Sequence, residues 1–107
     1  MNNAMYKICV YVPPSHLQDV KDALFSAGAG RIGNYQECCW QMLGEGQFKP
    51  STDAHPYQGQ IGQLEKTPEY RLEVVCAERC IHSAIAALLS AHPYEQPAYD
   101  LLQIVDI

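Results

Sequence analysis

Two short segments of the sequence carry a His-Pro-Tyr motif, HPYE at residues 92–95 and HPYQ at residues 55–58. Imidazole and carboxylate groups ligate divalent cations, and together with a phenol they could also contact a small polar ligand. His55, His92 and Glu95 are therefore candidate metal ligands. The alternative is a structural corner, because a histidine at a helix C-terminus is stabilised by the helix dipole and the prolines hold the following chain extended.

The glycine-rich segment GAGRIGNY, residues 28–35, is a second candidate. Phosphate loops run from a strand through glycines into a helix, whereas these glycines leave a helix and enter a strand. Gly28 is therefore predicted to begin a helix cap, with Arg31 near the negative end of that helix. His92 follows the second predicted helix as Gly28 follows the first, so both loops are expected at the same end of the sheet. Six residues form the tentative ligand site: Arg31, Tyr35, His55, Tyr57, His92 and Glu95.

No nucleophile elbow, zinc-protease or phosphate-loop signature is present, and no cysteine and histidine have the context of a catalytic triad. The sequence therefore predicts no enzyme and no catalytic residue. Five cysteines, an odd number, do not indicate a disulfide framework and are expected to fill apolar positions. The cofactor stays unknown, with a divalent metal as the candidate.

Composition limits the possible partners. The 107 residues should form a single domain, 1–107, and a net charge of −5 with seven scattered lysines and arginines argues against nucleic acid. No apolar segment reaches the roughly 18 residues that cross a bilayer, and the N-terminus does not resemble a signal peptide. A cytoplasmic protein without membrane contact is expected.

Hydrophobic periodicity predicts the order of the elements. Strands are expected at 6–12, 37–43 (interrupted by glycines), 69–76 and 98–105. Helices are expected from an N-cap at Ser15, with Gln18 completing a capping box, and over 78–92, where Pro93 stops the helix. Residues 50–67 are predicted to be a long loop.

The two halves of the chain resemble each other. An ungapped shift of 64 residues gives seven identities in thirty positions and places strand on strand and helix on helix. Two such halves predict an α+β, ferredoxin-like split-βαβ sandwich, with a four-stranded antiparallel sheet and two helices on one face. The other sheet face would carry apolar side chains, which predicts a homo-oligomer. That second set comprises Cys9, Tyr11, Cys38, Trp40, Met42, Val75, Leu102 and Ile104.

Several segments together resemble one family: VPPSHLQDVKDALFSAGAGRIGNYQECCW, GEGQFKP, AHPYQGQIGQLEK and AHPYEQPAYDLLQI. They are similar to the inserted domain of the Nif-three-like (NGG-one-interacting factor three) family, here expected as a stand-alone chain. The metal-binding motifs of that family lie in flanking halves, so the resemblance does not bring a dimetal site or a cyclohydrolase activity to this chain.

The resemblance implies a fold like that of the nitrogen-regulatory PII and divalent-cation-tolerance CutA proteins, and it favours a trimer with clefts between subunits. HPYEQP is similar to a CutA motif at His92, Pro93, Tyr94, Glu95 and Pro97. Nucleotide-binding loops of the PII type are not recognisable. Two functions stay open: a regulatory module that binds a small ligand or a metal ion between subunits, and a structural or protein-interaction domain without a ligand.

Overall fold

The computed structural model describes residues 4–105 and contains four strands and two α-helices. The strands are β1 (Met5–Val12), β2 (Trp40–Phe48), β3 (Glu65–Ala77) and β4 (Tyr99–Ile104). The helices α1 (Leu17–Ser26) and α2 (Ile81–Ala91) each follow one 3-10 turn, Pro14–His16 and Glu78–Cys80. None of the described helices is long and apolar enough to cross a membrane.

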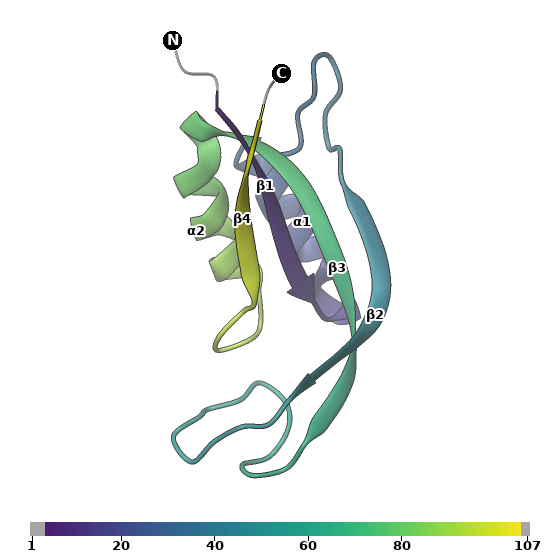
Figure 1. Cartoon of the computed structure of the whole chain (residues 1–107), viewed down its shortest axis with the longest axis vertical. Helices are drawn as coiled ribbons and strands as arrows, with labels where there is room; N and C mark the ends of the chain where they lie inside the picture. The colour runs from purple at the N-terminus through teal and green to yellow at the C-terminus, as the bar shows by residue number, and fades with distance from the viewer. Residues whose placement is uncertain (1–3, 106–107) are drawn as a thin grey trace.

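The strands form one antiparallel sheet in the order β2-β3-β1-β4, and both helices cover the same face (Figure 1). The predicted ferredoxin-like architecture is therefore confirmed. Between sheet and helices lies the core, which contains the side chains that the alternation in β3 placed inward, Leu72, Val74 and Cys76. Leu24 of α1 and Leu88 of α2 are fully buried against them.

The start of α1 differs from the prediction. Pro13 is extended and a 3-10 turn begins directly after it, closed by the His16 N–H donating to the Pro13 carbonyl. The Ser15 hydroxyl bonds to the His16 ring, and the Gln18 amide donates to Asp22. The capping box at Ser15 and Gln18 was wrong, because the proline pair starts a 3-10 turn that includes Ser15, and α1 begins only at Leu17, with His16 as an N-cap that makes no side-chain bond.

The end of α1 agrees with the prediction. Gly28 has a φ of +103°, which an L-residue adopts only under strain. Its N–H donates to the Phe25 carbonyl, and the N–H of Ala29 donates to the Leu24 carbonyl. This pair of bonds is a Schellman motif, which satisfies the last carbonyls of the helix. The glycine segment therefore caps a helix.

The hairpin formed by β2 and β3 is longer than predicted. Gly44 and Gly46 lie inside β2, and β3 begins at Glu65, so the predicted glycine interruption and the strand start at residue 69 were wrong. Pro68 is tolerated because this part of β3 pairs with β2 alone, and pairing with β1 begins only at Tyr70. The end of β2, the loop 49–64 and the start of β3 (residues 45–69) are called the arm below. Figure 1 shows the arm extending past the sheet and turning back under the connection between α2 and β4.

The helix-free sheet face has a charged centre and apolar edges. Glu73 bridges the side chains of Lys7 and Arg71 at 3.3 and 3.1 Å. On the outer strands, Trp40 is 50% and Leu102 54% exposed. The alternation of side chains was predicted correctly, but the ion pairs at the centre were not.

Candidate functional site

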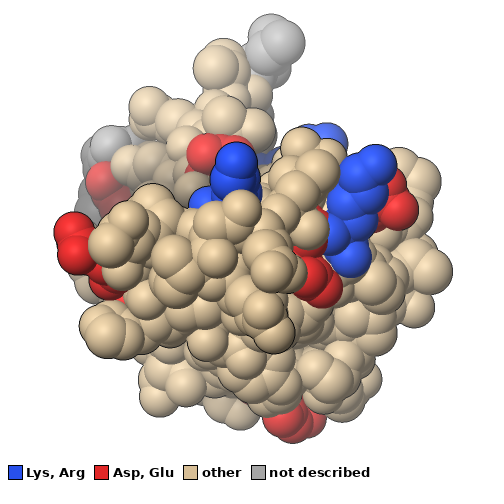
Figure 2. All heavy atoms as spheres, turned by 90° about the horizontal axis from the view of Figure 1, so that it is seen from below, with Lys and Arg blue, Asp and Glu red and all other residues tan. Residues whose placement is uncertain are grey.

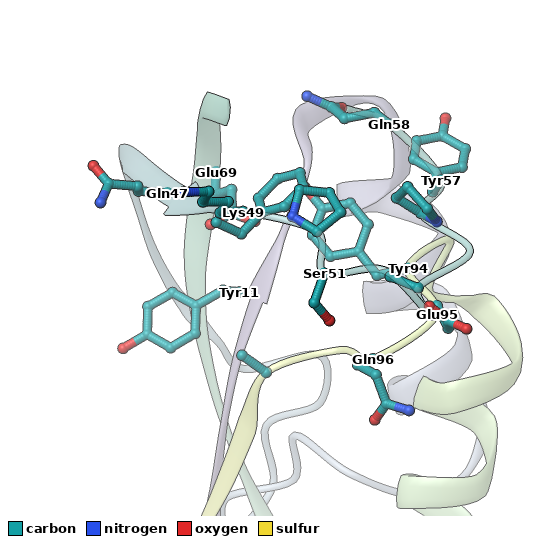
Figure 3. Close-up of a pocket in the computed structure, with 15 residues that line it drawn as sticks. Tyr11, Gln47, Lys49, Ser51, Tyr57, Gln58, Glu69, Tyr94, Glu95 and Gln96 are labelled. Carbon is teal, nitrogen blue, oxygen red and sulfur yellow. The ribbon is translucent and has the colours of Figure 1, made fainter. Parts of the chain in front are cut away.

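A pocket of about 340 Å³ lies at the end of the sheet where β1 ends. One wall comes from the arm and the other from residues 92–98, here called the corner, which joins α2 to β4. Tyr11, near the end of β1, contributes the remaining side (Figure 3). The volume falls within the range of small-molecule sites. Segments 40 residues apart in sequence therefore meet around one hollow, the arm–corner pocket.

His92 fixes the corner. It is only 6% exposed, and its Nε2 donates a hydrogen bond of 2.7 Å to the Tyr11 carbonyl. Its Nδ1 accepts a bond of 3.2 Å from the Tyr94 N–H. Because a carbonyl can only accept and a backbone N–H can only donate, the ring is the neutral tautomer with the proton on Nε2. Burial lowers the pKa of His92, and the bond to Tyr11 opposes that shift only in part.

Glu95 connects the corner to the arm. One of its carboxylate oxygens accepts a 2.9 Å hydrogen bond from the backbone N–H of His55. The predicted proximity of His55 and Glu95 is therefore present within one chain, but it uses the backbone of His55. The bond holds the loop 49–64 against the corner and so maintains the opening of the pocket.

Three aromatic rings form a concave wall of the pocket. The Tyr94 ring lies 6.3 Å from Phe48 and 6.1 Å from Tyr57, measured between centroids, and both pairs are tilted. Tyr94 also packs on the His92 ring at 4.8 Å, and Tyr57 meets the edge of His16 at 5.8 Å. These contacts hold the wall in place from behind, so the wall is ordered before any ligand arrives.

Glu69 of β3 lines the pocket on the side of Gln47 and Lys49 (Figure 3), and its carboxylate lies beside the Tyr94 hydroxyl. Burial and the Glu69 carboxylate both raise the pKa of Tyr94. That hydroxyl is buried and has no hydrogen bond of regular geometry among the described residues. The Glu69 side chain lies across the backbone of Gly46, where a Cβ would collide with the carboxylate. A glycine at position 46 therefore makes room for the acidic group.

Arg31 and Tyr35 lie at the opposite end of the sheet from the other predicted site residues. The loop that carries them is attached near the start of β1, where the Gly30 N–H donates to the Val75 carbonyl. The corner is attached near the end of β1, through the bond from the Tyr11 N–H to the Ala98 carbonyl. The expectation that both loops share one end was wrong, because the equivalent strands β1 and β3 are antiparallel and their following loops point in opposite directions.

Of the six predicted residues, His55, Tyr57, His92 and Glu95 come together at the pocket end. In this arrangement both ring nitrogens of His92 are engaged by the backbone. Within residues 4–105, no three His, Cys, Asp or Glu side chains are grouped as ligands of a metal ion. Metal binding by His55, His92 and Glu95 stays a prediction that would require His92 to give up one backbone bond.

Sequence reasoning missed Tyr11, Phe48, Glu69 and Tyr94 as pocket residues. Glu69 was predicted only as the first residue of a strand. Its place in the pocket depends on the length of the arm, which the sequence did not predict. Tyr94 was part of the HPYE motif, yet only its ring contacts show that it forms the wall. The available signal was the second His-Pro-Tyr motif in a long loop, which indicated that the loop and the corner belong together.

The molecular end that carries the pocket is mostly uncharged. Figure 2 views the molecule from that end and shows isolated acidic and basic side chains among neutral ones. A continuous basic track of the kind that binds nucleic-acid phosphates is not seen on this face.

Comparisons with known proteins agree with this fold. The chain is 44% identical over 99 residues to a GTP cyclohydrolase 1 type 2 homolog of Mycobacterium leprae, covering 92% of this chain and 26% of that protein. It is 41% identical over 103 residues to the protein of the same name from Halalkalibacterium halodurans, covering 96% and 28%. The chain thus spans about a quarter of the length of these relatives. No protein-family model matches it.

Solved structures give the same result. A Bacillus cereus protein related to NIF3 superposes with a TM-score of 0.84 at 38% identity, over 97% of this chain and 26% of that one. CutA from Synechococcus elongatus has a TM-score of 0.69 at 14% identity, covering 97% and 80%. The Bacillus subtilis GlnK-ATP complex has a TM-score of 0.64 at 9% identity, covering 97% and 86%. The last two likenesses concern the fold. Over nearly its whole length, the chain is accordingly similar to one segment of longer NIF3-related proteins, and it has the CutA- and PII-like fold.

Proposed function

We propose that the chain is a non-enzymatic binding or regulatory module that holds a small ligand in the arm–corner pocket. The observation that carries this proposal is the pocket itself, a preformed hollow with an aromatic wall and a carboxylate and a phenol at its base. The Tyr94 hydroxyl is buried beside the Glu69 carboxylate, so a ligand with a hydrogen-bond donor would meet two oxygen groups there. His55, Tyr57 and Glu95 belong to this site together with Glu69 and Tyr94.

The name of the relatives refers to a GTP cyclohydrolase, but it describes proteins about four times as long as this chain. The pocket shows no hydrogen-bonded nucleophile and base. The buried His92, in the corner next to the pocket, has both ring nitrogens engaged by the backbone, which leaves no lone pair free for general base catalysis. Binding is therefore the activity that the geometry supports best.

We further propose that the module is a homo-oligomer, with a trimer as the favoured assembly. The apolar edges of the helix-free sheet face support it, because Trp40, Met42 and Leu102 are each at least half exposed on that face. Such side chains are commonly covered by a second subunit. In such an oligomer, a neighbouring subunit could place its own Arg31 and Tyr35 near the pocket. All six residues of the predicted ligand site would then lie together.

The second candidate is a structural or protein-interaction domain without a small ligand. The two backbone bonds of His92 favour it, because they give the corner a sufficient structural cause. Under this alternative the aromatic wall only holds the arm in place. The two candidates differ in whether the pocket binds a small molecule with saturation.

Calorimetric titration and thermal denaturation with divalent cations, nucleotides and small organic amines and acids test the proposal. Saturable heat and a raised melting temperature with one class, lost in Tyr94→Ala but retained in Leu89→Ala, an exposed change on α2, are expected. The absence of heat and of any thermal shift with all classes would refute ligand binding and favour the structural alternative.

A further inference from the structure

We infer that the arm–corner pocket takes an organic cation, with an ammonium, amidinium or guanidinium head. This inference rests on the proposed function, because it names the ligand class of the same pocket. Two independent features of the pocket lead to it. One is the arrangement of its aromatic rings, and the other is its excess of acceptor groups over cations.

Several aromatic rings gather around the pocket. Phe48, Tyr57 and Tyr94 form one wall with centroid separations near 6 Å, and Tyr11 stands at the side of the same hollow. The face of an aromatic ring is negative, so several rings around one volume attract a positive charge. Each ring contributes about 0.5–1 kcal/mol when the site is open to solvent. An anionic ligand would gain nothing from this wall.

The polar groups of the pocket are mainly acceptors. Neither Glu69 nor Glu95 forms a salt bridge with a described lysine or arginine; the ion pairs of residues 4–105 join Glu73 to Lys7 and Arg71. Glu95 uses one oxygen for the His55 N–H, which leaves its other oxygen available. Glu69 lines the pocket next to the Tyr94 hydroxyl. A cationic head that donates hydrogen bonds would meet a carboxylate at each side.

Lys49 is the one cation among the lining residues. The lining therefore has two carboxylates against one ammonium, which leaves it net negative before a ligand binds. A phosphate or carboxylate ligand would have a single lysine as its charged partner and would face both Glu69 and Glu95. The charge of the pocket thus selects against anions and for cations.

Benzamidine and benzamide provide the test, because the two molecules share the flat ring and differ in the charge of the head group. Titration by calorimetry and by ligand-observed NMR gives both affinities on the full chain. We expect benzamidine to bind at least about tenfold more tightly than benzamide, since a hydrogen bond to a charged group contributes about 1.5–3 kcal/mol. Glu69→Gln should reduce this preference, and Glu78→Gln, an exposed change at the far end of the sheet, should keep it.

The outcomes separate this inference from the proposed function. Equal affinities for benzamidine and benzamide, or a preference unchanged in Glu69→Gln, would overturn the cation assignment while leaving a ligand-binding pocket. Binding of a nucleotide or a carboxylate with no binding of benzamidine would also overturn it. No binding of any compound would remove the proposed function as well. Thermal melts of Glu69→Gln show whether the variant is folded, and Tyr57→Leu gives a second reading, with an expected loss of about threefold in benzamidine affinity.

Discussion

Replacing His92 by alanine should strongly lower the free energy of unfolding. The ring is buried, and the substitution leaves the Tyr11 carbonyl and the Tyr94 N–H without their partners. Each buried backbone group left unpaired costs about 1–3 kcal/mol. We expect the free energy of unfolding to fall by about 2–5 kcal/mol, a large part of the roughly 5–15 kcal/mol that stabilises a domain.

Urea denaturation followed by circular dichroism measures the effect. His82→Ala is the matched control, because His82 is an exposed histidine on α2 and should change stability by less than about 0.5 kcal/mol. His92→Gln can keep a donor for the Tyr11 carbonyl, and His92→Asn can keep an acceptor for the Tyr94 N–H, so each should recover part of the loss.

A loss of stability in His92→Ala no larger than in His82→Ala would refute the reasoning, because it would mean that neither backbone bond contributes. Partial recovery by only one of the two replacement residues would show which bond carries the effect. The aromatic contact between His92 and Tyr94 is lost in the alanine, glutamine and asparagine variants alike, so it does not affect the comparison among these three.

The remaining predictions concern pH, the pocket base and the open sheet face. Because burial lowers the pKa of His92, the unfolded chain binds a proton at this residue more readily than the folded chain. The contribution of neutral His92 to the free energy of unfolding is complete above pH about 6.5 and should be lost as the pH falls below that value. Denaturation curves of His92→Gln across that range should not show this pH dependence. Gly46→Ala should displace the carboxylate over it and weaken ligand binding, while the nearby Gly44→Ala, whose added Cβ would make only an ordinary contact with the Glu69 carbonyl, should bind normally in the same titration. Leu102→Asp should dissociate the oligomer in light-scattering measurements, and Leu43→Asp, equally exposed but on the helix-covered side of the sheet, should not; the opposite pattern would place the interface elsewhere.

The sequence predicted the fold well because the two halves have clear periodicity. The alternation in β3 and the helical spacing in α2 placed Leu72, Val74 and Leu88 in the core, where the structure has them. The glycine at the end of α1 has a local cause that the sequence shows directly. The capping box failed because a proline pair starts a 3-10 turn that includes Ser15, a competition that spacing does not resolve.

The site was predicted only in part, because it depends on distant segments. The corner could be identified from HPYE, and the second motif indicated the loop that meets it. Glu69 could not be placed, because its position at the base of the pocket depends on β2 continuing through Gly46. Arg31 was grouped with the wrong end, since an internal repeat shows which loops are equivalent but not that their parent strands are antiparallel.

The central claim is that the arm–corner pocket binds a small ligand, and NMR titration of ¹⁵N-labelled protein with the compounds that give heat tests it most directly. Saturable shift changes confined to the backbone signals of the arm and the corner, including those of Glu69, Tyr94 and Glu95, are predicted. Changes confined to the loop of Arg31 and Tyr35, or no saturable change at any residue, would contradict the claim.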